Sequence, residues 1–312
     1  MGEKEKKEDE RVYYFIVPAI VSAASVIAFL SRLPGHEIAV SVLWLSYIIL
    51  SGVAFLPITH LFLPTFKDKG YAFSFVLGGM LLPGFLMYVA GVLFKIPFNR
   101  ASCIVFTIVS LLAFAVISCR REKCIYDFSK EEKRQIGIEI STVAFVYCLF
   151  LYLISKNSAA YGLEKFMDYG FLNKMLVSEK LPPEDIWYSG KSINYYYGGQ
   201  YFCAFLSKLL GTRAKYSYNL CRALIPAVFT VQVFSLSFQL IFDRTKKAKT
   251  AIPFGFLSAA MAAFGANGHY FFFKILKIGG KSYSYWFPDA TRLIGHYPEN
   301  TGDATIHEVP CY

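Results

Sequence analysis

The chain has 312 residues, of which 55% are hydrophobic, 18% aromatic and only 17% charged. Because a soluble domain usually carries about a quarter charged residues, this composition argues against an ordinary soluble globular domain. The formal net charge of +10 does not indicate nucleic-acid binding. The Lys and Arg residues lie in short segments between apolar runs, whereas a nucleic-acid binder gathers them on one face.

The seven cysteines form no C-x-x-C pair, and most of them lie in or beside apolar runs. Cysteine in such a setting behaves as a small hydrophobic residue. The spacing therefore predicts neither a disulfide framework nor a zinc site. No Walker loop, HExxH, GxSxG or dinucleotide fingerprint occurs, which argues against soluble-type nucleotide chemistry.

Apolar runs long enough to cross a hydrocarbon core of about 30 Å recur along the chain. They predict an all-α polytopic membrane protein with about seven transmembrane helices. Pro83 lies inside one of these runs, and a membrane helix tolerates such a proline when neighbouring groups satisfy the freed backbone. The predicted spans are residues 12–31, 39–60, 71–94, 101–118, 137–155, 217–241 and 251–273.

Positive charges predict the orientation of these spans. The connecting segments FKDKG, CRREKCIYDFSKEEKRQ and FDRTKKAKT are rich in Lys and Arg and fall on one face, which should be cytoplasmic. The charged tail, residues 1–11, shares that side, so we expect a multi-pass cell-membrane protein with a cytoplasmic N-terminus. The remaining regions are a five-span region at 12–155, a first outer segment at 156–216, two spans within 217–273 and a second outer segment at 274–312.

The two outer segments differ from the spans in composition, being rich in Tyr, Trp, Gly, Pro, Asn and acidic residues. Within the first, the stretches YGLEKFMDYGFLNKMLVSEKL and YYYGGQYFCAFLSKLLG predict helices that lie in the membrane interface without spanning it. The second outer segment stops at HEVPCY with no closing helix, which predicts a shortened reading frame. Because loops carry function more often than scaffolds do, we expect the functional site in these segments.

The stretch MDYGFLNKMLVSEKLPPEDIWYSGKSINYYYGGQY resembles a family of uncharacterised membrane proteins named for a YYYxG motif and grouped with the GT-C glycosyltransferases. The resemblance continues through WFPDATRLI and TIHEVP and covers most of the chain. It implies a GT-C-like fold in the lipid bilayer. It also implies a membrane enzyme that transfers a sugar from a polyprenyl-phosphate carrier on the extracytoplasmic face.

Asp168 is the residue that we expect to act as catalytic base or as a ligand of a divalent cation, Mg or Mn. It follows the fifth predicted span, which is where GT-C enzymes place their catalytic acid, and a carboxylate there can deprotonate an acceptor hydroxyl. Asp185 would be the second catalytic carboxylate. The alternatives are a helix-surface or capping role for Asp168 and a turn-shaping role for Asp185, which follows Pro-Pro-Glu.

Other candidates would bind the sugar, the lipid or the phosphate. The triple tyrosine and its glycines predict a binding wall, although an aromatic belt at the membrane interface would also explain the tyrosines. In the second outer segment Arg292 suits a phosphate, and His307 and Glu308 would join Asp168 at the cation; an ordinary hydrated loop is the alternative there. The predicted substrate-binding residues are Asn173, Trp187, Asn194, Tyr195, Tyr196, Tyr197, Gly198, Asp289 and Arg292.

Two other hypotheses stay open. A non-enzymatic transporter or lipid-handling protein would be expected to hold ionisable residues at mid-membrane, whereas the predicted spans are almost free of them. The other hypothesis is an inactive fragment of a longer enzyme.

Overall fold

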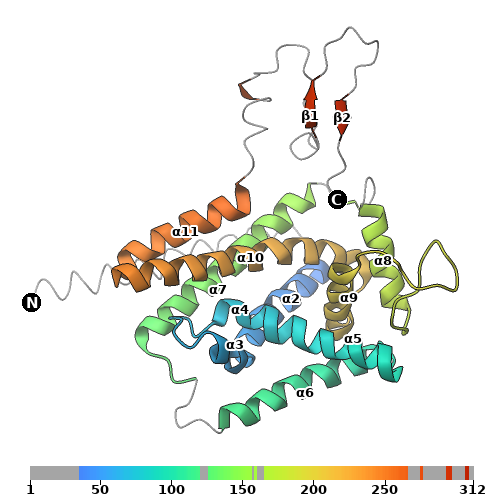
Figure 1. The fold of residues 1–312 in the computed structure, drawn as a ribbon, viewed down its shortest axis with the longest axis horizontal. Coiled ribbons are helices and arrows are strands. Elements are labelled where there is room, and N and C mark those ends of the chain that lie inside the picture. Colours follow the sequence, from blue (N-terminus) through green and yellow to red (C-terminus); the bar gives the residue numbers. More distant parts are fainter. Residues whose placement is uncertain are drawn as a thin grey trace, which may run out of the picture. The chain divides into compact units, whose positions relative to one another are not determined.

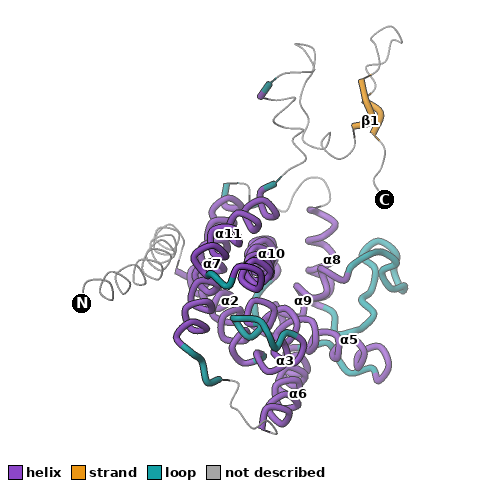
Figure 2. The backbone as a smooth tube through the Cα atoms, turned by 60° about the vertical axis from the view of Figure 1, so that its left-hand side comes forward, coloured by secondary structure: helices purple, strands orange, loops and turns teal. Residues whose placement is uncertain are grey.

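A computed structural model gives the fold, and it describes residues 35–119, 126–156, 158–159, 165–265, 275–276, 293–296 and 306–308. The chain divides into two compact units, Met1–Ala259 and Ala260–Tyr312. The described part of the first unit is built from helices, drawn in purple in Figure 2. The second unit contains a short antiparallel strand pair, β1 and β2, labelled in Figure 1.

The helices follow the apolar runs of the sequence. α11 continues from the first unit into the second. The helical bounds are α2 Gly35–Ala54, α3 Leu56–Phe62, α4 Tyr71–Ser74, the π-helical segment η1 Phe75–Leu81, α5 Leu82–Phe94, α6 Arg100–Cys119, α7 Lys130–Ser155, α8 Lys165–Val177, α9 Gly198–Leu210, α10 Ala214–Thr245 and α11 Ala248–Phe264. The strands are β1 Leu293–His296 and β2 Ile306–Glu308.

Four stretches of helix in the described part of the chain are long and apolar enough to cross a membrane. They are Gly35–Ala54, Tyr71–Phe94, Lys130–Ser155 and Ala214–Thr245. They confirm the prediction of a helical protein with several candidate spans. The strand pair departs from the all-α prediction, because a few residues of the second outer segment pair as an antiparallel ladder.

The predicted span 101–118 lies within α6, Arg100–Cys119, and the predicted span 251–273 overlaps α11, Ala248–Phe264. Neither is among the four stretches that are long and apolar enough to cross a membrane within the described residues. The predicted span 12–31 lies outside the described residues. The count of seven spans and the GT-C-like fold therefore stay predictions.

α7 and α10 pack along each other and form the most extensive helix pair of the first unit (Figure 1). α7 begins with a capping box, in which the Ser129 side chain accepts from the Glu132 amide while the Glu132 carboxylate accepts from the Ser129 amide. This reciprocal pair satisfies two amides that the first turn leaves without helical partners. Buried Tyr147 of α7 and Val231 of α10 belong to the main apolar core.

Pro83 interrupts the backbone ladder of its span, as the sequence indicates. It follows the π-helical segment η1 and, lacking an N–H, cannot donate to the carbonyl of Gly79 four positions earlier. The Tyr47 hydroxyl of α2 donates to that carbonyl at 2.6 Å instead. This confirms that a neighbouring helix satisfies a group left by the proline.

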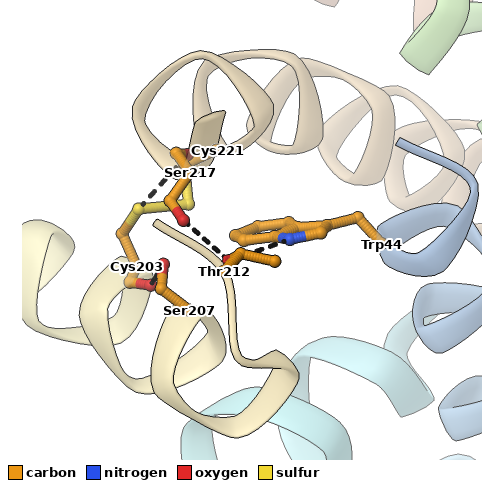
Figure 3. Close-up of a disulfide and its surroundings, with 6 residues drawn as sticks. All are labelled: Trp44, Cys203, Ser207, Thr212, Ser217 and Cys221. Carbon is orange, nitrogen blue, oxygen red and sulfur yellow. Dashed lines mark hydrogen bonds between the residues drawn. A yellow bond between two sulfur atoms is a disulfide. The ribbon is translucent and has the colours of Figure 1, made fainter. Parts of the chain in front are cut away.

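A disulfide joins Cys203 of α9 to Cys221 of α10 (Figure 3). The prediction that the cysteines form no disulfide was therefore wrong for this pair. The two residues lie 18 positions apart in the sequence, and their Cα atoms are brought within 6.1 Å when α9 folds back beside the start of α10. Beside the disulfide, the Thr212 and Ser217 hydroxyls are 2.7 Å apart, and the Trp44 indole donates to Thr212 at 3.3 Å.

Candidate functional site

Asp168 and the YYYGG motif meet in space. Asp168 is half-buried in the first turn of α8, and the side-chain amide of Gln200 donates to its Oδ1 at 2.7 Å. Gln200 directly follows Gly198 and Gly199 in the first turn of α9. Asp168 therefore lies in the first turn of one helix and beside the start of another, where the positive ends of helix dipoles favour a negative charge.

The three tyrosines of the motif separate into two environments. Tyr197 is half-buried at the N-cap of α9, and its hydroxyl lies 2.6 Å from the Tyr88 hydroxyl of α5. Burial raises the pKa of the Tyr197 phenol, and the hydrogen bond with Tyr88 raises it further. Tyr195 and Tyr196 are exposed, with ring centroids 3.9 Å apart. The prediction of a binding wall stays open for this exposed pair, whereas Tyr197 anchors the start of α9.

Gly198 and Gly199 lie in open space. A Cβ atom added at either position would meet no described atom within 4 Å beyond the neighbouring residues and the helix's own backbone. Packing therefore does not require glycine at these two positions. The start of α9 also has no side-chain cap, so its first amides remain available on an exposed surface.

Phe171, which is buried in α8, connects several of the predicted binding residues. The exposed Trp187 ring meets it edge-on at 5.5 Å between centroids, and the Tyr195 ring lies 6.3 Å away. Asn173 of α8 and Asn194 before the triple tyrosine are both exposed. The first outer segment thus presents exposed aromatic rings and amides on a buried aromatic base, a mixture suited to sugar or to the membrane interface.

Asp185 has a local structural role. Its Oδ1 accepts the backbone amides of Trp187 at 2.7 Å and Tyr188 at 2.9 Å, and its own amide donates to Lys191. These bonds hold a tight turn, as the alternative reading of Pro-Pro-Glu-Asp expected. No contact between Asp185 and Asp168 is found in the described part of the chain, and a catalytic role for Asp185 stays a prediction.

The predicted residues of the second outer segment cannot be joined to this site. Asp289 and Arg292 lie outside the described residues. For His307 and Glu308 only the backbone is described, in β2. Their predicted roles at phosphate and cation stay predictions.

The described residues do not make up a divalent-cation site. No group of three or more His, Cys, Asp or Glu side chains gathers within them. At Asp168, one carboxylate oxygen already accepts the Gln200 amide, which is a donor and would face a cation unfavourably. The divalent cation at Asp168 therefore stays a prediction.

Arg222 of α10 belongs beside this site, and sequence reasoning missed it. It is half-buried, its guanidinium lies 5.6 Å from the centre of the Tyr218 ring, and it donates to Asn219 at 3.0 Å. Tyr218 in turn meets the Tyr169 ring edge-on at 5.7 Å and lies within electrostatic reach of Asp168. A signal existed, because Arg222 is the one Lys or Arg inside the seven predicted spans, and such residues usually serve a function.

A cavity of about 410 Å³ adjoins the Arg222 partner Asn219. It lies between α2, α7 and α10. Glu37 and Lys215 bring opposite charges to its wall, while Leu151 and Leu220 supply apolar surface. The combination can accept a polar group attached to an apolar chain.

Lys208 is a second basic residue that sequence reasoning did not place. It is 9% exposed in α9, and its ammonium donates to the carbonyl oxygens of Phe98 and Ser178, the latter at 2.7 Å. It also lies 4.3 Å from the centre of the Phe98 ring. Burial lowers the pKa of this ammonium to about 8. Lys208 fastens α9 to the end of α8 and so helps hold Gln200 near Asp168.

Comparison with known proteins bears on the whole arrangement. No curated protein and no solved structure matches the chain. A family model described as an uncharacterized membrane protein family, DUF2298, matches residues 82–312, which is well over half of the chain and includes the motif, Asp168 and Arg222. The chain therefore belongs to the DUF2298 family of uncharacterized membrane proteins.

Proposed function

We propose that the chain is a GT-C-like glycosyltransferase that transfers a sugar from a polyprenyl-phosphate carrier to an acceptor on the extracytoplasmic face. The observation that carries the proposal is the half-buried Asp168 carboxylate, oriented by Gln200 next to the YYYGG motif. Its Oδ2 makes no hydrogen bond within the described residues and would accept the proton of an acceptor hydroxyl. A carboxylate held in this way is suited to general-base catalysis.

The proposed reaction is a displacement at the anomeric carbon of the donor sugar. The acceptor oxygen forms the new bond to that carbon as Asp168 takes its proton. The bond from the anomeric carbon to the carrier phosphate breaks, and the phosphate leaves with the electron pair. Arg222, and Lys215 at the cavity wall, would offset the negative charge on that phosphate, since they are the basic side chains next to Asn219.

Transfer of labelled sugar from polyprenyl-phosphate donors tests the proposal in membranes containing the protein. We expect Asp168→Asn to lower the transfer rate by roughly 100-fold or more, because the amide cannot accept the proton. The matched control is Glu131→Gln, which neutralises an exposed acid in the first turn of α7. Equal rates for Asp168→Asn and the unsubstituted chain at equal expression would remove Asp168 from the mechanism.

The second candidate function is non-enzymatic lipid handling. The cavity favours it, because charged and apolar side chains share one wall, as a lipid headgroup and its chain require. Binding of a polyprenyl-phosphate sugar without transfer to any acceptor would support this function over the enzyme.

A further inference from the structure

Glu139 is the one acidic residue inside the predicted spans, and it is fully buried in α7 at 0% exposed. Its carboxyl lies within hydrogen-bonding reach of the carboxyl of Asp68, which is 1% exposed in the link before α4. Ionisable side chains in a membrane interior are costly and usually mark a function. Two adjacent buried acids raise the question of which one carries a charge.

Asp68 has the partners of an ionised carboxylate. Its Oδ1 accepts the Gly70 amide at 2.8 Å, and its Oδ2 accepts the Ala72 amide and the Ser235 hydroxyl, each at 3.0 Å. Three donors directed at one carboxylate favour its charged form. The Ser235 hydroxyl comes from α10, so the same carboxylate also joins that helix to the link.

Glu139 has the partners of a neutral acid. Its Oε1 accepts the Gln135 side-chain amide at 2.9 Å. Its Oε2 is buried and meets no hydrogen-bond donor in the part of the chain that the structure describes. An ionised Glu139 would hold an unsatisfied negative oxygen beside the Asp68 charge. A protonated Oε2 would instead donate to Asp68. This removes both the unsatisfied buried oxygen and the repulsion between two negative charges.

The nearby lysines are engaged elsewhere. The Lys69 ammonium donates to the Asp127 carbonyl at 2.6 Å and lies 3.6 Å from the Glu132 carboxylate. The Lys67 ammonium lies over the Phe242 ring at 4.9 Å. Neither contact brings a positive charge to the acid pair.

The other described groups that act on Glu139 are uncharged. Tyr71 of α4 lies within electrostatic reach of it, and the Tyr71 hydroxyl donates to the Ile49 carbonyl of α2. Ser235 faces it from α10, and Gln135 lies one turn earlier in α7. Within the described residues, no positively charged side chain is among the groups that act on Glu139.

We propose that Asp68 and Glu139 bind one proton between them, held on Glu139 Oε2 and shared with Asp68, at the predicted cytoplasmic end of the helices. The proton joins α7 to the link before α4, and Ser235 extends the connection to α10. Its loss would place two negative charges in a buried site and weaken this packing. The proposal does not depend on sugar transfer.

Infrared spectroscopy of the full chain in lipid nanodiscs tests the proton directly. At neutral pH we expect a C=O stretching band of a protonated carboxylic acid, which Glu139→Gln removes. Glu131→Gln, an exposed position in the same helix, is the matched control and should keep the band. Absence of the band from the unsubstituted chain, or its persistence in Glu139→Gln, would overturn the proposal.

Thermal unfolding across a pH series provides a second measurement. Since the folded state would hold a proton that the unfolded state releases, the midpoint should fall with rising pH relative to Glu139→Gln. The glutamine variant should fold, because its carboxamide can donate to Asp68 as the protonated acid does. Midpoints of the two proteins that run parallel across the series would contradict the proposal. A sodium ion in place of the proton would also contradict the proposal. In that case the midpoint of the unsubstituted chain would rise with sodium chloride but not with choline chloride, and the midpoint of Glu139→Gln would not respond to sodium.

Discussion

The Gln200 side-chain amide and Asp168 Oδ1 are joined by a 2.7 Å hydrogen bond across 32 positions of sequence. The bond links the first turn of α9, where the YYYGG motif ends, to the first turn of α8. A hydrogen bond from a neutral amide to a charged group contributes about 1.5 to 3 kcal/mol, enough to favour one rotamer of a half-buried carboxylate. Gln200 thus acts as a positioning residue for Asp168.

Replacement of Gln200 tests this positioning role. Gln200→Leu should lower the rate of sugar transfer by roughly 10- to 100-fold, because a misplaced base reacts poorly, while KM changes little. Gln200→Glu keeps the size of the side chain but replaces the donor by a carboxylate, so it should lower the rate as Gln200→Leu does. An unchanged rate in both variants would show that Gln200 does not act on the base.

Lys208 predicts a pH dependence of stability. Because burial lowers its folded-state pKa to about 8 from the usual value of 10.5, the unfolded state binds more protons between these two values. The free energy of unfolding should therefore rise with pH across this window, by at most about 1.4 kcal/mol per pH unit, and the contribution should be lost as pH falls through 8. Lys208→Met should remove the rise in denaturation profiles, and an unchanged slope in this variant would contradict the assignment.

The disulfide between Cys203 and Cys221 predicts a loss of stability on reduction. Closing a loop of 18 residues should contribute about 3 kcal/mol through the unfolded state. The double variant Cys203→Ser with Cys221→Ser should lower the unfolding midpoint, and a reductant should then have no further effect. Mass spectrometry after alkylation supplies the control, because only the reduced chain should gain label at these positions.

Several of the apolar helices could be predicted, because an apolar run longer than a membrane is thick has few alternatives to a helix. Their limits could not: the predicted span 39–60, for example, divides into α2 and α3. The contact partners of single residues could not be predicted from the sequence. Cys203 and Cys221 each look like small hydrophobic residues in their own helices, and only the return of α9 onto α10 brings them together. For the same reason the sequence indicates Asp168 but not Gln200, whose role depends on a contact between helices distant in sequence.

Charged residues within the spans carried more information than their low number suggested. Arg222 and Glu139 are the only charged residues of the seven predicted spans. One lies beside the Tyr218 ring near Asp168, and the other lies beside Asp68. Each could be recognised as a functional candidate from the cost of a charge in a membrane. Their partners lie in other helices and links, so they follow from the fold alone.

The compensation of Pro83 by Tyr47 can be tested with a double-mutant cycle. Tyr47→Phe removes the hydroxyl that donates to Gly79 and should cost about 1 kcal/mol, the usual size of one hydrogen bond within a membrane protein. Pro83→Ala restores a backbone N–H that can serve the same carbonyl. In that background Tyr47→Phe should cost much less, as measured by the unfolding midpoint. Equal costs in both backgrounds would show that the tyrosine stabilises the helices through packing, without a role at the proline.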